Sequence, residues 1–420
     1  MSGDVTVFGF FGGNDGINGG IKLGHESFWR EGLVKKGLFA GESFTDPATG
    51  QTVQPAKDQN GEVITSYGNS RKLRFITYAA KLGANYIMSG KSRVYANIGY
   101  FADAPKFNQA FLSPRTRNSV VDGLTTVKTF STDFNWQYSG NGINFRSTVY
   151  FTTIKDQSKI MSAYDDVQNA FSNFALSGID QRHMGLEVGF KFPTVIIPNL
   201  SVQGVLALGS AVYTSNPTMV QTLDNSASLV SYNDQTVFEV PYWKSSPYYT
   251  KDVYGNIPEG TGINDYKRMQ SHYVPSTPQT AASLGLNWNY NYWFVDFDVE
   301  YFDRAYLDMN PLYRTEYAVL GPDYQTSPEE IEYMTAQEKF PAAFLVNASV
   351  GKSWYIQRKY QLGFSFNAKN LLNNKNVKTG GYEQTRMVDN TANKDRYYRF
   401  DSKYFYNSGM NYMLNIYFRF

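Results

Sequence analysis

The sequence ends with "NYMLNIYFRF", residues 411–420, in which apolar side chains recur at every second position. A repeat of two residues is typical of a β-strand, whose successive side chains point to opposite faces. One face of this predicted strand carries Tyr412, Leu414, Ile416, Phe418 and Phe420. A soluble edge strand with such a face would invite aggregation. The stretch therefore indicates that something outside the chain covers the apolar face.

The same alternation recurs along the chain. In "WFVDFDVEY", residues 293–301, an apolar face is backed by Asp296, Asp298 and Glu300, and in "HMGLEVGFKF", residues 183–192, Glu187 lies on the polar face. Most of the predicted strands have about ten residues or more, which is enough for the nine to eleven or so that cross a bilayer at a tilt. Strands are predicted at 4–11, 17–24, 73–88, 92–101, 127–138, 143–154, 181–192, 199–212, 278–289, 292–305, 341–353, 359–371 and 409–420.

The connections between these strands alternate between short and long. Short turns are predicted at 89–91, 139–142, 193–199, 290–291 and 353–358, and long polar stretches at 24–72, 102–126, 155–180, 213–277, 306–340 and 372–408. A transmembrane β-barrel has this arrangement, with tight periplasmic turns, long outer loops and strands that are apolar toward lipid and polar toward the lumen. The carboxylates Glu187, Asp296, Asp298 and Glu300 are then candidates for lumen-facing residues.

One outer loop contains a predicted helix in "SPEEIEYMTAQEK", residues 327–339. Ser327 is the expected N-cap, Pro328 stands in the first turn, and Glu330 completes a capping box.

Composition narrows the function classes. The 33 Tyr, 30 Phe and 35 Gly residues favour strands and tight turns. The net charge of +2 comes from 39 basic and 37 acidic residues without a basic stripe, so we expect no nucleic-acid partner. The chain has no Cys, which excludes disulfides and thiolate catalysis. No run reaches the roughly eighteen apolar residues of a spanning helix.

No motif predicts an enzyme, a metal site or a cofactor. His25, His183 and His272 lie far apart and lack zinc-ligand spacing. The glycines of "GFFGGNDGINGG", residues 9–20, do not match a phosphate-binding loop, and a flexible turn is favoured. Asp296 and Asp298 share one strand face and could act as a catalytic acid and base. The favoured interpretation is that they line a water-filled barrel lumen.

A cluster of aromatic residues in one long loop is the candidate substrate-binding region. It lies in "VPYWKSSPYYTKDVYG", residues 240–255, and comprises Tyr242, Trp243, Tyr248, Tyr249 and Tyr254. Exposed aromatic rings offer large contact area at low entropic cost, which suits capture of a sugar, peptide or chelate. An aromatic girdle at the membrane interface combined with ordinary loop packing is the favoured interpretation, and the five residues are candidates for binding.

Five stretches together suggest a known family: "VYANIGYFADAPKFNQAFLSPRTRN" (94–118), "IDQRHMGLEVGFKF" (179–192), "YFDRAYLDMNPLYRT" (301–315), "FNAKNLLNNKNVKTGGY" (366–382) and the strand that ends at Phe420. In this order along the chain, they resemble the C-terminal β-barrel of TonB-dependent outer-membrane transporters of Gram-negative bacteria. The resemblance covers most of residues 70–420.

The resemblance implies a function and a set of partners. It implies energised uptake of a nutrient too large or too scarce for porins, of the siderophore, oligosaccharide or peptide class. The implied partners are outer-membrane lipids, the barrel-assembly machinery that recognises the terminal aromatic strand, and the TonB complex acting through a plug domain. A surface lipoprotein is a further candidate partner.

The chain departs from this family in strand number. Such transporters have an N-terminal plug and a barrel of about 22 strands, whereas about thirteen strands and no plug are predicted here. We therefore expect residues 1–420 to form a single, incomplete transmembrane barrel domain that lacks the plug and the early strands. Two alternatives stay open: a passive porin with a smaller closed barrel of roughly twelve or fourteen strands, and a secreted carbohydrate-active β-protein with its apolar faces in a core.

Overall fold

The structure is a computed structural model of the 420-residue chain. It describes residues 6–10, 16–33, 42–45, 50–55, 57, 63, 65, 67–112, 118–121, 123–165, 170–215, 217–223, 237–239, 272–275, 277–314, 333, 335–357, 359–384 and 399–420.

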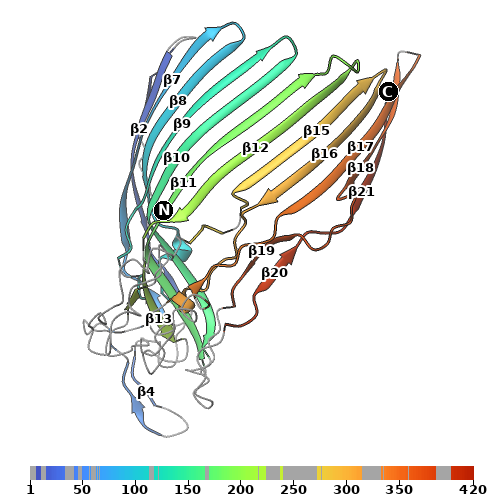
Figure 1. The fold of residues 1–420 in the computed structure, drawn as a ribbon. Helices are drawn as coiled ribbons and strands as arrows, with labels where there is room; N and C mark the ends of the chain where they lie inside the picture. The colour runs from blue at the N-terminus through green and yellow to red at the C-terminus, as the bar shows by residue number, and fades with distance from the viewer. Residues whose placement is uncertain are drawn as a thin grey trace, which may run out of the picture.

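One antiparallel sheet dominates the fold and curves into a wall (Figure 1). Its order is β1-β2-β7-β8-β9-β10-β11-β12-β15-β16-β17-β18-β21, and among the described residues β1 and β21 are not paired with each other. The strands are β1 (Thr6–Phe10), β2 (Gly16–Phe28), β7 (Leu73–Ser89), β8 (Ser92–Asp103), β9 (Val127–Gly140), β10 (Ile143–Asp165), β11 (Ala170–Pro193), β12 (Leu200–Tyr213), β15 (Thr280–Tyr290), β16 (Trp293–Asp303), β17 (Ala343–Ile356), β18 (Tyr360–Lys369) and β21 (Asn411–Arg419).

The predicted fold class is confirmed, and each predicted strand coincides with one strand of this order. The largest differences are at β10 and β11, which continue well past the predicted ends at 154 and 181. A β-bulge explains them, because Asp156 has a positive φ of 61° and the register of the pair shifts between Ile154 and Lys159. The bulge interrupts the two-residue alternation, so the pattern indicates a strand end where the pairing in fact continues.

Short turns lie at one end of the sheet and the long connections at the other (Figure 1). The long connections contain small strands that the sequence pattern does not reveal: β3 (Glu31–Leu33), β4 (Phe44–Thr45), β5 (Thr52–Val53), β6 (Tyr67–Asn69), β13 (Thr218–Leu223), β14 (Val237–Glu239), β19 (Lys378–Tyr382) and β20 (Lys403–Tyr406). They also contain the 3₁₀ helices η2 (Phe107–Gln109) and η5 (Pro311–Arg314).

The predicted helix at 327–339 is described only at its end. Ser327, Pro328 and Glu330 lie outside the described residues, whereas Tyr333 and Thr335 are helical. Within the described part of the chain, no helix is long and apolar enough to span a membrane.

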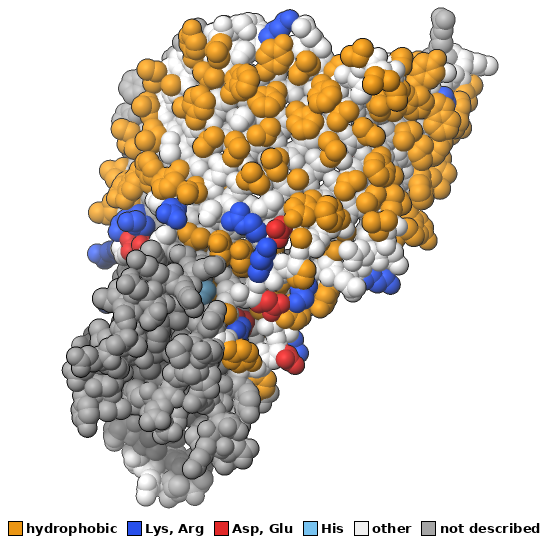
Figure 2. All heavy atoms as spheres, viewed as in Figure 1, with side chains coloured by type: hydrophobic (Ala, Val, Ile, Leu, Met, Phe, Trp, Pro, Cys, Tyr) orange, Lys and Arg blue, Asp and Glu red, His pale blue; other side chains and the backbone are white. Residues whose placement is uncertain are grey.

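One face of the main sheet is apolar and exposed. Figure 2 shows apolar side chains spread over this face from one side of the sheet to the other. Leu414 is 58% exposed, Leu284 57% and Val149 53%, although burying one such side chain is worth about 1.5–3 kcal/mol. The face includes Ile21, Leu82, Ile98, Phe134, Val149, Leu284, Phe344 and Ile416.

The buried apolar clusters lie at the loop end of the sheet instead. One cluster contains Leu73, Phe75, Ala110 and Phe111. A second contains Leu112, Val121, Ala175 and Val220. No second sheet or helical layer among the described residues covers the apolar face, whereas a secreted β-protein would bury these side chains in a core.

On the opposite face, a glycine allows an aromatic side chain to lie flat across a strand. Gly363 on β18 stands in register between Ser353 on β17 and Tyr417 on β21. The Tyr417 ring lies where a Cβ at Gly363 would be, and its hydroxyl group is 2.5 Å from the Ser353 Oγ. The missing side chain therefore lets one hydrogen bond span three strands.

We expect Gly363→Ala to lower the free energy of unfolding of the detergent-solubilised protein by about 1–3 kcal/mol, because the new methyl group displaces the Tyr417 ring. Urea unfolding followed by tryptophan fluorescence measures the change. Gly189→Ala on β11 is the matched control, since a Cβ there meets no atom within 4 Å. Equal stability of the two variants would show that the Tyr417 contact contributes nothing.

Candidate functional site

Three of the predicted lumen-facing carboxylates form a row on the polar face of β16. Ser349 Oγ donates a hydrogen bond to Asp296 at 3.1 Å, and the Asn287 amide also donates to Asp296. Asn347 Nδ2 donates to Asp298 at 2.8 Å and to Glu300 at 3.1 Å. Neutral donors on β15 and β17 thus hold the carboxylates in line, and no ion pair to them occurs among the described residues.

The fourth predicted carboxylate lies on the same face, several strands away. Glu187 on β11 is exposed and stands in register between Thr148 and Ala207. The structure therefore brings Asp296, Asp298 and Glu300 together and leaves Glu187 apart.

Polar side chains continue across this face toward the other end of the sheet. Asn97 Nδ2 donates to Asp133 at 3.0 Å, and Thr148 Oγ1 donates to Asn135 at 2.7 Å. Asn97 and Asp133, together with Lys81, contribute to a hollow of about 190 Å³. Hydrogen-bonded polar side chains therefore lie on this face both at β8–β10 and at β15–β17, where water or a polar solute can contact them.

The aromatic residues predicted to bind a substrate all lie outside the described residues: Tyr242, Trp243, Tyr248, Tyr249 and Tyr254. Within the described ranges, no group of three or more His, Asp or Glu side chains is arranged to hold a metal ion.

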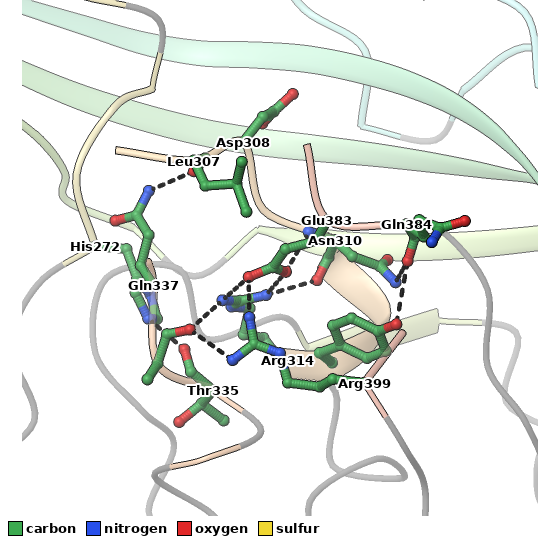
Figure 3. A network of polar contacts seen from close by, with 12 residues as sticks. His272, Leu307, Asp308, Asn310, Arg314, Thr335, Gln337, Glu383, Gln384 and Arg399 are labelled. Atoms are coloured by element: carbon green, nitrogen blue, oxygen red, sulfur yellow. Dashed lines mark hydrogen bonds and ion pairs between the residues drawn. The ribbon is translucent and has the colours of Figure 1, made fainter. Parts of the chain in front are cut away.

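At the loop end, a buried ion pair joins two long connections (Figure 3). Arg314 on η5 and Glu383, just after β19, have side-chain exposures of 0% and 1%. The guanidinium binds the carboxylate through both of its terminal nitrogens, and the second contact measures 2.9 Å. Such a two-point contact between arginine and a carboxylate is both strong and directional.

Further groups complete the coordination of Glu383. Arg399 donates to its carboxylate at 2.5 Å, and the backbone N–H of Asn310 donates at 2.8 Å. Arg314 in turn donates to the carbonyl oxygens of Asn310 and Ala336 at 3.1 and 3.0 Å. We call Asn310, Arg314, Ala336, Glu383 and Arg399 the loop-base network.

Gln337 joins this network to a third connection. Its side-chain Nε2 donates to the carbonyl oxygens of Tyr273 at 2.8 Å and Leu307 at 3.0 Å, and its Oε1 accepts from the Tyr273 N–H at 2.7 Å. Tyr273 also stacks on Tyr306 with 4.1 Å between ring centroids. Burial, reinforced by the neighbouring phenol of Tyr273, raises the pKa of Tyr306 to about 12.

An ion pair ties the same region to a strand elsewhere in the sheet. Lys159 on β10 binds both carboxylate oxygens of Asp308, at 3.0 and 3.1 Å. Asp308 follows β16, which lies four places from β10 in the strand order. The connection after β16 therefore reaches across the loop end of the sheet.

The sequence analysis did not predict the loop-base network. Its central pair, Arg314 and Glu383, is separated by 69 residues, and the alternation of side chains along single strands does not detect such distant pairs. The available signal was in the stretches that carry the family resemblance, because "YFDRAYLDMNPLYRT" contains Asn310 and Arg314, and "FNAKNLLNNKNVKTGGY" ends next to Glu383.

Sequence comparison finds neither a matching protein-family model nor a matching curated protein. The structure, in contrast, is similar to solved structures. It matches a copper transporter, OprC, with a TM-score of 0.54 and 12% identity, over 99% of this chain and 46% of that chain. It also matches the ferric citrate transporter FecA in its unliganded form, with a TM-score of 0.50 and 11% identity, over 97% of this chain and 43% of that one.

These similarities define the fold. The chain has the fold of the β-barrel portion of TonB-dependent outer-membrane receptors, as the sequence resemblance implies. It spans less than half the length of either of the two proteins.

We expect Glu383→Gln to lower the free energy of unfolding by about 3–5 kcal/mol, because it leaves the buried charge of Arg314 without its counter-ion. Urea unfolding in detergent measures the loss, and limited proteolysis localises it to the loop end. Asp303→Asn is the control, since its pair with Lys339 is partly exposed and worth at most about 1 kcal/mol. Similar losses in both variants would contradict a special role for the buried pair.

Proposed function

We propose that this chain is the barrel wall of an outer-membrane receptor that takes up a scarce or large nutrient with energy from the TonB complex. The observation that carries the proposal is the two-faced sheet: an exposed apolar face backed by a face that carries hydrogen-bonded polar side chains, on long antiparallel strands. Lipid would cover the first face, and the second would line the passage, as in transmembrane β-barrels.

The residues take specific roles in this proposal. Asp296, Asp298, Glu300 and Glu187 line the passage, where they meet water, the solute or a plug domain. Tyr242, Trp243, Tyr248, Tyr249 and Tyr254 contribute to solute capture from an outer loop. The similarity to transporters for copper and ferric citrate supports a transport role, and we place the solute in the class of siderophores, oligosaccharides or peptides.

The outward row Tyr412, Leu414, Ile416, Phe418 and Phe420 is our candidate for the signal that the barrel-assembly machinery recognises. All five side chains are exposed on β21 and just after it. The plug that TonB would pull, and a surface lipoprotein that would deliver the solute, are the other proposed partners. None of these roles involves covalent chemistry, so we propose no enzymatic activity.

The first test is membrane association. We expect the protein to sediment with outer membranes, to resist extraction by high salt and alkaline carbonate, and to dissolve only in detergent, because its apolar face requires hydrocarbon. Immunoblotting of the fractions provides the measurement. Recovery of folded protein in the carbonate supernatant would contradict the membrane placement.

The second test separates energised transport from passive diffusion. Cells that express the intact receptor are compared with a deletion strain for uptake of radiolabelled ferric chelates, oligosaccharides and peptides. We expect uptake of one class to depend on the gene and to stop when the proton-motive force is dissipated. Gene-dependent uptake that persists after dissipation would instead indicate a passive porin.

A further inference from the structure

Three consecutive aliphatic residues lie on the turn that joins β11 to β12, at the end of the sheet where the short turns lie (Figure 1). Val195 is 100% exposed, Ile196 91% and Ile197 48%. They extend the exposed apolar surface past the strands, since β11 ends at Pro193 and β12 begins at Leu200. An apolar turn in water is a site of aggregation, so something outside the chain is expected to cover it.

Hydrogen bonds fix the shape of this turn. The backbone N–H of Thr194 donates to the carbonyl oxygen of Leu200 at 2.8 Å, and the Thr194 hydroxyl group donates to the carbonyl oxygen of Ile197 at 2.8 Å. Asn199 has a positive φ of 63°, and its carbonyl oxygen accepts from the backbone N–H of Asn289 on β15 at 3.1 Å. The turn is thus preorganised, and little ordering entropy is lost when its aliphatic side chains are covered.

Other short turns present polar or charged groups. Lys91, between β7 and β8, donates to the side chain of Asn141 at 2.9 Å. Lys352 on β17 donates to the carbonyl oxygen of Asn291, in the turn between β15 and β16, at 2.7 Å. By contrast, no ionisable residue occurs at 192–200. The turn between β11 and β12 can therefore enter a nonpolar environment without burying a charge.

The turn continues the apolar face of the sheet. Phe192 on β11 is the register partner of Val202 on β12, which is in turn the partner of Leu286 on β15. Closer to the turn, Leu200 pairs with Trp288. Tryptophan is enriched where hydrocarbon meets the headgroups. The apolar surface therefore runs from the lipid-facing side of the sheet to the turn, and acyl chains at this boundary are the occupant that fits both.

We propose that Val195, Ile196 and Ile197 insert among the phospholipid acyl chains of the periplasmic leaflet and anchor this end of the sheet in the membrane. Apolar side chains at the interface strengthen membrane binding in proportion to the area that they bury. The proposal rests on the membrane placement proposed above and is independent of energised uptake.

Site-directed spin labelling of the full protein in vesicles of phosphatidylethanolamine and phosphatidylglycerol tests this insertion. Because the 420-residue chain contains no Cys, a single introduced cysteine carries the nitroxide. Collisions of the label with oxygen, which concentrates in hydrocarbon, are compared with its collisions with a water-soluble nickel chelate. We expect labels at Val195→Cys and Ile196→Cys to have a several-fold higher ratio of oxygen to nickel accessibility than a label on a turn that lies in water.

Two control positions set the limits of the scale. Leu284→Cys lies on the apolar face and should report hydrocarbon. Gly90→Cys lies in the turn between β7 and β8, where a Cβ meets no atom within 4 Å, and should report water. Labels at Val195 and Ile196 that match Gly90, with Leu284 in hydrocarbon, would overturn the anchor alone. A label at Leu284 that reports water would contradict the membrane placement itself.

The same labels in isolated outer membranes distinguish lipid from a protein partner. We expect the accessibility of Val195 and Ile196 to be the same there as in the vesicles. Labels that report water in the vesicles, but are immobilised and shielded from both reagents in outer membranes, would overturn the proposal in favour of a periplasmic protein.

Discussion

Contact between one face of the sheet and lipid hydrocarbon is the condition on which the rest of this structure depends. The apolar side chains from β2 to β21 have no protein partner layer among the described residues, and their exposure to water would be costly. Strands inside the sheet can meet this condition because their backbone N–H and C=O groups bond to the strands on either side, so the hydrocarbon meets only side chains. The buried clusters at the loop end are then local supports for the connections and not the core of the fold.

The polar face follows from the same alternation of side chains. Its carboxylates are stabilised in a different way from the carboxylate of the loop-base network. On β16, Asp296, Asp298 and Glu300 receive hydrogen bonds from neutral amide and hydroxyl groups and remain partly exposed. Because water can approach, no cation is required to stabilise them. Glu383 is shielded from water, where an unpaired carboxylate would be far more costly, and it is held by two arginines.

The alternation of side chains in the sequence is sufficient to predict the strands and the face on which each carboxylate lies. Asp296, Asp298 and Glu300 share a face simply because they are two residues apart. The same reasoning fails at Asp156, where the bulge changes the phase, and at β13, which lies in a connection and pairs with the extension of β11. It also fails for Arg314 and Glu383, because their pairing depends on how two long connections fold against each other.

The loop-base network also explains how the connection between β12 and β15 can be long without separating from the sheet. The backbone N–H of Tyr213 donates to the carbonyl oxygen of His272 at 3.0 Å, so the two ends of the intervening segment meet. Closing a long loop costs entropy that rises only slowly with length, so a few bonds at the base offset much of it. Gln337 holds Tyr273 next to that junction, and the residues around Gln337 contact Arg314 and Arg399 through Ala336. The two ends of this connection, at Tyr213 and His272, are thus held near the same buried charges that hold the connections after β16 and β19.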